Sequence, residues 1–116
     1  MLEADFERAV VDVAHQFGWL VAGFRTAQQG DRYLTPCKHD AVGFPDLTLV
    51  HQTGHVIFAE MKTNRGRMSG EQEMWADWIE SAEANMTNVA YYLWRPRDAD
   101  QIISILSHGR TTSWNL

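Results

Sequence analysis

Apolar side chains recur at helical spacing in three parts of the chain. Over residues 3–17 they form a single stripe, and Gly18 is a typical residue to end such a helix. Ser69 and Gln72 match a capping box, which predicts that a second helix starts there and runs to about Asn85. Its predicted buried face carries Met74, Trp75, Trp78, Ile79 and Ala82. A third helix is expected over residues 98–107, whose apolar residues are Ile102, Ile103, Ile105 and Leu106.

Short apolar runs between these helices predict strands over residues 19–24, 46–51, 55–61 and 89–94. Residues 25–43 show no period and are expected to form a long loop, which makes them a candidate substrate-contacting region. The elements then follow the order α-β-β-β-α-β-α. Because no repeat or linker is visible, the sequence predicts one α/β domain over residues 1–116, with a central sheet of about four strands flanked by helices.

A predicted hairpin between two of these strands brings acidic residues together. Residues 52–54 (Gln-Thr-Gly) form a three-residue connection with glycine last, which is typical of a tight hairpin turn. Pairing the residues that flank this connection places Asp46 opposite Glu60. Lys62 then lies two residues beyond Glu60 on the same face of the sheet.

Two facing carboxylates repel each other, so a positive charge should lie between them. Lys62 can supply part of that charge, and Mg²⁺ or Mn²⁺, which prefer carboxylate and water ligands, would supply more. Such a site suits phosphodiester hydrolysis, because the cation polarises the phosphoryl oxygen and Lys62 can orient the attacking water. A structural ion pair between Lys62 and either acid is the alternative that this geometry leaves open.

The net charge of −5 argues against a uniformly basic nucleic-acid-binding surface. Eight of the ten basic residues nevertheless lie between Arg25 and Arg97, whereas the acids concentrate in two predicted helices, at 3–12 and 71–83. This distribution is compatible with a locally basic groove on an acidic body. Four loop residues that flank the two acidic strands are candidates for phosphate contacts, with solvated surface charge as the ordinary alternative: Lys38, His39, Arg65 and Arg67.

Other residue patterns exclude several classes of protein. The single cysteine, Cys37, cannot form an internal disulfide and favours a reducing, cytoplasmic setting; no activating motif surrounds it, so a structural role is favoured over a nucleophilic one. The acidic N-terminus argues against a secretory signal, and the longest apolar stretch, residues 19–23, is too short to span a bilayer. His51 and His55 lack two further zinc ligands nearby, so a solvated cross-strand pair is expected instead.

Two segments resemble the signature of PD-(D/E)XK nucleases: Gly43-Phe44-Pro45-Asp46-Leu47 and Ala59-Glu60-Met61-Lys62. Further matches extend along nearly the whole chain: Glu3-x-x-Phe6, Gly18-Trp19, Ser69-x-x-Gln72-x-x-Trp75 and Tyr92-Leu93-Trp94-Arg95-Pro96. Together they resemble the small stand-alone VRR-NUC proteins found largely in phages and bacteria. Pro-Asp with Glu-x-Lys is a short motif by itself, whereas this order and spacing with these flanks is specific.

The resemblance implies a restriction-endonuclease-like αβββαβ core with a mixed sheet and Mg²⁺- or Mn²⁺-dependent cleavage of DNA, often branched or flapped, such as a Holliday junction. It assigns metal binding to Asp46 and Glu60, a backbone carbonyl ligand to Met61, and assistance of the attacking water to Lys62. It also places Gln72 close to the metal site, which is compatible with a capping role at the first turn of a helix.

The family also has an acidic residue from the first helix, for which Glu3 and Glu7 are candidates. On a helical wheel Glu3 lies about 50° from the centre of the apolar stripe and Glu7 about 90°. Glu3 is therefore preferred, to hold a second ion or an ordered water of the metal site, and Glu7 is the alternative. A charge that compensates the helix N-terminus would explain Glu3 equally well.

The sequence thus predicts a DNA endonuclease, and two alternatives stay open. One is a non-catalytic nucleic-acid-binding or interaction module on the same fold, and the other is an RNA-directed or toxin-like nuclease. No base-reading motif is visible, so selectivity for the shape of the DNA is the expectation. Cutting both strands or resolving a junction would need two active sites, which predicts a homodimer.

Overall fold

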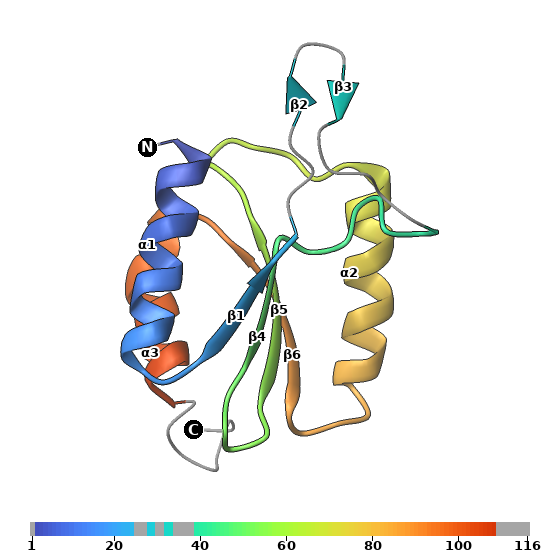
Figure 1. Ribbon diagram of the computed structural model, residues 1–116. Helices are drawn as coiled ribbons and strands as arrows, with labels where there is room; N and C mark the ends of the chain where they lie inside the picture. Colours follow the sequence, from blue (N-terminus) through green and yellow to red (C-terminus); the bar gives the residue numbers. More distant parts are fainter. Residues whose placement is uncertain (1, 25–27, 30–31, 34–38, 109–116) are drawn as a thin grey trace.

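Four strands form one mixed sheet in the order β1-β4-β5-β6 (Figure 1). The computed structural model describes residues 2–24, 28–29, 32–33 and 39–108. β1 pairs antiparallel with β4 and β4 antiparallel with β5, whereas β5 and β6 are parallel. The strands have these bounds: β1 Leu20–Gly23, β4 Leu47–Val50, β5 Val56–Met61 and β6 Val89–Trp94.

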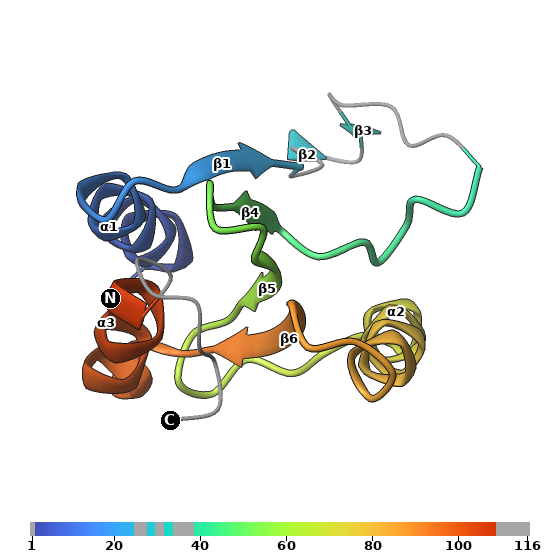
Figure 2. The same ribbon diagram turned by 90° about the horizontal axis from the view of Figure 1, so that it is seen from below.

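Helices cover both faces of this sheet (Figure 2). α1 (Glu3–Gln16) and α3 (Ala99–His108) lie side by side on one face, and α2 (Gly70–Glu83) lies alone on the other. A short 3₁₀ helix, η1 (Pro96–Asp98), connects β6 to α3. The predicted α/β class, with a mixed four-stranded sheet flanked by helices, is confirmed. None of the described helices is long and apolar enough to cross a membrane.

The hydrophobic core lies between the sheet and the α1–α3 layer. Side chains alternate across a strand, and on β5 the ones that enter this core are Ile57, Ala59 and Met61, all fully buried. Trp19 ties the layers together, because its indole N–H donates to the Leu106 carbonyl of α3 at 2.9 Å. The intervening β5 residues, including Glu60, consequently face the α2 side of the sheet.

The predicted turn and cap chemistry is confirmed at three places. Gly18, which follows α1, and Gly54, which closes the β4–β5 hairpin, both have the positive φ that glycine adopts without strain. At the start of α2, the Ser69 hydroxyl accepts from the Gln72 N–H while the Gln72 side chain accepts from the Ser69 N–H. These local devices fix where α1 and α2 lie relative to the strands.

The predicted buried face of α2 is wrong at three residues, because Ala82 is exposed as well as Met74 and Trp78. Trp78 is 75% exposed and Met74 is 47% exposed, whereas the buried residues of the helix are Ala76 and Ile79. The stripe facing the sheet is rotated because Gln72 points inward to make a hydrogen bond with a strand residue. A polar residue with a buried partner therefore decides the orientation of this helix, against the apolar surface of Trp78.

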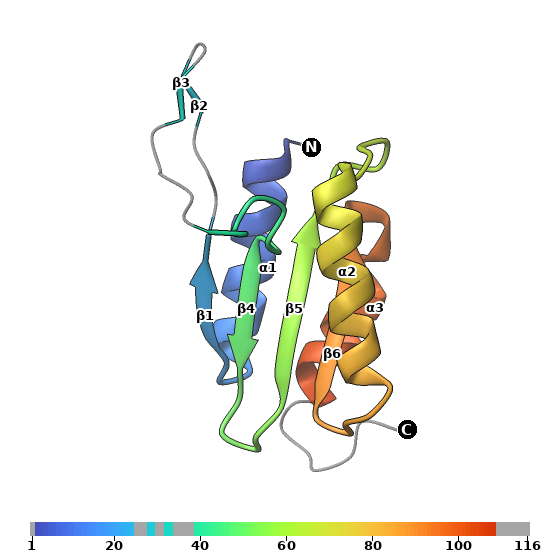
Figure 3. The same cartoon turned by 90° about the vertical axis from the view of Figure 1, so that its right-hand side faces the viewer.

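The predicted long loop contains a short pair of strands. β2 (Gln28–Gln29) and β3 (Arg32–Tyr33) pair antiparallel, separately from the main sheet (Figure 3). Strands of two residues are too short to leave an alternating pattern in the sequence, which is why residues 25–43 appear aperiodic.

Candidate active site

Asp46 and Glu60 lie opposite each other at one end of the sheet. Leu47 pairs with Ala59 in the β4–β5 ladder, and the next pair outward in the same register is Asp46 with Glu60. The Asp46 carboxylate is held there by the Met61 N–H, which donates to its Oδ2 at 2.8 Å. The hairpin register predicts that Asp46 faces Glu60, and the structure places the two acids in this way.

Glu60 is almost fully buried, with 1% of its surface exposed. Its Oε1 accepts from the Gln72 side-chain amide at 3.0 Å, whereas its Oε2 is buried without a hydrogen-bond donor among the described residues. Burial, followed by the neighbouring Asp46 carboxyl, raises the pKa of Glu60 to about 9. Without a cation, the protonated form of Glu60 is consequently favoured at neutral pH.

Gln72 belongs both to the helix cap and to this site. Its side-chain oxygen accepts from the Ser69 N–H at 2.8 Å, which leaves the amide N–H₂ as the group that reaches Glu60. Because the cap fixes which end of the amide is the donor, Gln72 presents a donor to Glu60 and not an acceptor. Gln72 is thus a positioning residue for the Glu60 carboxylate, as well as a cap.

The end of β5 adds a carbonyl and an ammonium group. Lys62 donates its backbone N–H to the Trp94 carbonyl of β6 at 3.0 Å. The Met61 carbonyl belongs to the same trans peptide, so it points the opposite way, toward the Asp46 side. The charge of Lys62 acts on Glu60 and partly offsets the rise in its pKa. Carboxylates, a carbonyl and a cationic side chain therefore converge at one strand end.

This donor set fits a hard divalent cation. All the candidate ligands are oxygen atoms, from Asp46, Glu60 and the Met61 carbonyl, and one buried oxygen of Glu60 has no other partner among the described residues. No group of three or more His, Cys, Asp or Glu side chains converges within the described part of the chain. A cation here would consequently draw its remaining ligands from the backbone, from water or from substrate.

Glu3, in α1, has an electrostatic effect on Glu60. Its charge is among the causes that raise the pKa of Glu60, as the smallest of them, and Glu7 is not among these causes. Glu3 stands in the first turn of α1, at the same end of the molecule as the end of β5 (Figure 1). This electrostatic effect is compatible with Glu3 as the acid of α1, and the choice between Glu3 and Glu7 stays a prediction.

The loop residues predicted to contact phosphate are solvent-exposed where the structure describes them. Arg65 and Arg67 lie in the connection from β5 to α2, directly after Lys62, and His39 lies ahead of the Asp46 segment with a positive φ of 58°. Lys38 and Cys37 lie outside the described residues. Arg65, Arg67 and His39 are therefore accessible to a polyanion such as DNA. Their roles in binding phosphate stay a prediction.

Gly43 fixes the segment that carries Asp46 against α2. Its φ is +90°, and a Cβ built on it would lie 2.5 Å from the carbonyl carbon of Glu71. No side chain fits in that space, so the chain can pass this close to the first turn of α2 only with glycine. The Gly43–Asp46 segment and the helix that bears Gln72 thereby approach the Glu60 carboxylate together.

Arg95 is a residue whose role the sequence analysis missed. Its guanidinium donates to the carbonyls of Thr63 and Gly66, at 2.6 and 2.7 Å. These carbonyls belong to the turn that follows Lys62, and a Cβ built on Gly66 would lie 3.4 Å from the Lys62 side chain. Arg95 thus holds the turn that packs against the stem of Lys62, and we assign it as a positioning residue.

Replacing Arg95 with alanine should lower the rate of the reaction that depends on Lys62 by about 10–100-fold, because two carbonyls lose their donor and the turn is released. Kinetics on a cleaved substrate should show the loss mainly in kcat. The matched control is Arg97→Ala, which removes the same charge from an exposed side chain whose backbone alone bonds to Asn64. Equal effects of both replacements would show that charge matters and that position does not.

The two histidines of the hairpin are structural, and their predicted solvation is wrong for one of them. His55 is 4% exposed, and the Thr53 hydroxyl lies 3.0 Å from its Nδ1 and 3.1 Å from that of His51. His51 also reaches the Phe17 carbonyl at 2.9 Å. Burial, and then His51, lower the pKa of His55. Hydrogen bonds to the loop and, for His51, to the residue that follows α1 give these histidines a structural role.

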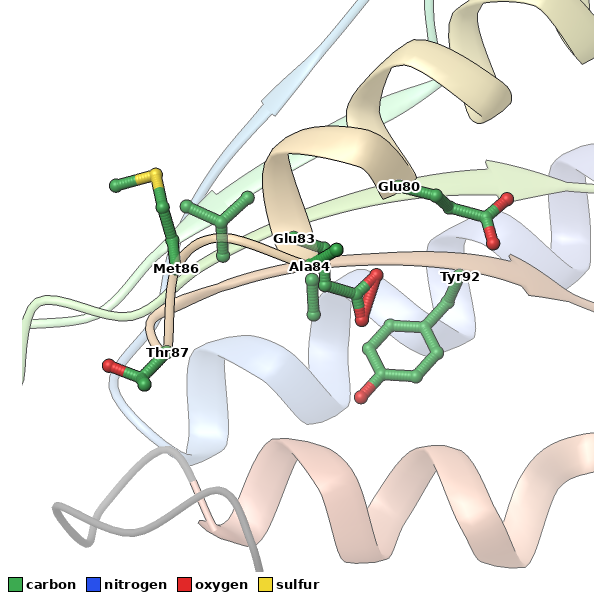
Figure 4. Close-up of a pocket in the computed structure, with 8 residues that line it drawn as sticks. Glu80, Glu83, Ala84, Met86, Thr87 and Tyr92 are labelled. Atoms are coloured by element: carbon green, nitrogen blue, oxygen red, sulfur yellow. The ribbon is translucent and has the colours of Figure 1, made fainter.

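A separate hollow lies at the far end of α2 (Figure 4). Two acidic side chains of the helix, Glu80 and Glu83, line it together with Tyr92 of β6. Glu83 already accepts from the Tyr91 N–H, and its charge, after burial, raises the pKa of Tyr92. The catalytic candidates stand at the opposite end of α2, so this hollow is not part of their site.

Comparison of the chain with protein-family models, with curated proteins and with solved structures finds no match. The resemblance to PD-(D/E)XK nucleases therefore stays a prediction from the motifs. Function must consequently be argued from the chemistry of the site itself, because a fold of this class hosts many activities.

Proposed function

We propose that the protein is a divalent-metal-dependent DNA endonuclease that acts at the site formed by Asp46, Glu60 and Lys62. The observation that carries the proposal is the Asp46–Glu60 pair, in which two carboxylates face each other and one buried oxygen lacks a donor among the described residues. Burying such a pair without a cation is unfavourable. The arrangement is chemically sensible when a cation and a phosphate complete it.

Each residue has a distinct task in this proposal. Asp46, Glu60 and the Met61 carbonyl would hold Mg²⁺ or Mn²⁺, which when bound would supply Lewis-acid polarisation of the phosphate and a lowered pKa for water. Lys62 orients the attacking water and offsets the negative charge that develops on the phosphate. Gln72 keeps Glu60 in place through its amide, and Glu3 adds a further carboxylate for a second ion or an ordered water.

The proposed substrate is DNA, with selectivity for branched, junction or flap structures. Exposed cations lie at the strand ends that bear the site, because β5 and β6 are parallel and the segments after both carry exposed arginines: Arg65, Arg67 and Arg97. Phosphate contacts there would position the backbone without reading its sequence.

Cleavage of labelled duplex, flap, four-way-junction and single-stranded DNA, in Mg²⁺, Mn²⁺ or EDTA, tests the proposal. We expect metal-dependent cutting that falls by about 10³-fold or more in Asp46→Ala, since the replacement removes a ligand. Asp77→Ala, at an exposed acid of α2, is the matched control and should cut normally. An RNA competitor in the same tube identifies an RNA nuclease, and survival of every substrate in both metals would leave only a binding module.

Cutting both strands would further require two copies of this one-site chain, so we propose a homodimer that acts in the cytoplasm of a bacterium or a phage-infected cell. Light scattering checks the assembly. A monomer that makes complete double-strand cuts at the same concentration would contradict it, and cell fractionation checks the location.

A further inference from the structure

Phe24 is the next residue across the sheet from the Asp46–Glu60 pair. Gly23 pairs with Leu47 in the β1–β4 ladder, and one pair further the Phe24 N–H donates to the Asp46 carbonyl at 2.9 Å. Phe24, Asp46 and Glu60 therefore occupy one row across three chain segments. Residues paired across neighbouring strands point to the same face of a sheet, so the Phe24 ring lies on the face that carries the two carboxylates.

The ring of Phe24 is both exposed and supported. The residue is 57% exposed, which is unusual for a large aromatic side chain beside a buried site. Its ring meets that of Phe44 at 86° with 5.7 Å between centroids, and Phe44 is itself in contact with the rings of Phe58 on β5 and Trp75 on α2. One perpendicular contact covers at most one face of the Phe24 ring, so the other face is held in place and open.

We propose that the open face of Phe24 stacks on an unpaired nucleobase of the DNA substrate, beside the scissile phosphate. This inference rests on the proposed function and names its substrate class: DNA with at least one unpaired nucleotide at the cleavage position. Bases of an intact duplex are already stacked on each other, whereas an unpaired base can place its face on an aromatic ring. A neutral ring next to two carboxylates suits a base better than a second phosphate, which those charges repel.

Binding without cleavage provides the first test. An oligonucleotide with 2-aminopurine at a single unpaired position is titrated in EDTA, and stacking on Phe24 should quench its fluorescence. Phe24→Leu keeps an apolar side chain and should bind the oligonucleotide about 10-fold or more weakly, with the quench lost, while Phe24→Tyr should retain both. Trp78→Ala, which removes another exposed aromatic residue far along α2, is the matched control and should behave as the parent protein.

Cleavage provides the second test, through the ratio of kcat/KM for a flap to that for a duplex of the same sequence. Phe24→Leu should lower this ratio about 10-fold, because only the flap offers an unpaired base to the ring. If the parent protein cuts and neither the ratio nor the quench depends on Phe24, the inference is overturned and the nuclease stands. If the parent protein cuts nothing but its quench depends on Phe24, the nuclease proposal fails and the base-stacking site stands.

Discussion

Replacing Glu60 with glutamine should abolish metal-dependent cleavage and, at the same time, stabilise the metal-free protein at neutral and alkaline pH. Activity is lost because an amide is a poor ligand for Mg²⁺ and removes the charge that holds it, and we expect a loss of about 10³-fold or more. The fold should gain because the replacement ends the burial of a carboxylate opposite Asp46. The new amide oxygen can still accept from Gln72.

The raised pKa of Glu60 also predicts how the stability of the metal-free protein changes with pH. The pKa of Glu60 rises from 4.5 to about 9 on folding, so between those values the folded protein binds more protons than the unfolded chain. The free energy of unfolding of the metal-free protein should therefore fall as pH rises from 4.5 to 9, and be independent of this group outside that window. Mg²⁺ should restore stability at the alkaline end, because it supplies the positive charge that the lost proton of Glu60 no longer provides.

Thermal unfolding in EDTA between pH 5 and 9 measures both effects. Glu60→Gln should flatten the pH profile and raise Tm by about 5 °C at pH 8. Glu73→Gln, at an exposed acid of α2, removes the same charge from the surface and should leave the profile unchanged. A parent protein whose stability is flat over this range would show that Glu60 is ionised and satisfied without a cation.

The main features of the site could be predicted from the sequence because they depend on local register. A three-residue turn closed by Gly54 fixes the pairing of the strands on either side, and that pairing brings Asp46 opposite Glu60. The capping box of Ser69 and Gln72 is likewise a signal within four residues. Where the relevant contacts lie close together in the chain, the pattern of residues was sufficient.

The features that sequence analysis missed depend on contacts between distant segments. The bonds of Arg95 to Thr63 and Gly66 span about thirty residues, and no spacing rule links an arginine after one strand to carbonyls after another. The apolar surface of Trp78 predicts a core position, but the bond of Gln72 to Glu60 turns another face of α2 toward the sheet and leaves Trp78 in solvent. The spacing of apolar residues predicts which face of a helix is buried, but it does not take a single buried hydrogen bond into account.

Phe24 shows a further limit of the same kind. Its residue type and its place in an apolar run indicate a core position in the sequence. Its exposure follows from the topology, because β1 and β6 are opposite edges of the sheet, and α2 covers the face that carries Phe24 at the β6 edge. Phe24, which follows the edge strand β1, thus lies beside the catalytic candidates, and no described helix packs over its ring.

Replacing Lys62 with methionine should separate catalysis from binding. Methionine retains an unbranched apolar stem that can pack against Gly66, but it lacks the ammonium group that acts on Glu60. If Lys62 orients water and stabilises charge in the transition state, kcat should fall about 10²–10³-fold while the affinity for DNA changes little. Single-turnover cleavage and DNA binding measured on the same flap substrate give the two quantities.

Arg67→Met is the control for Lys62→Met, because Arg67 is an exposed cation of the same loop. A residue that contacts only phosphate contributes equally to the ground state and the transition state, so its loss should raise KM and spare kcat. The two replacements should therefore differ in kind and not only in size. If Lys62→Met cuts at the parent rate, the ammonium group serves only as a structural ion pair with the two acids, and the water must be oriented by another group of the site.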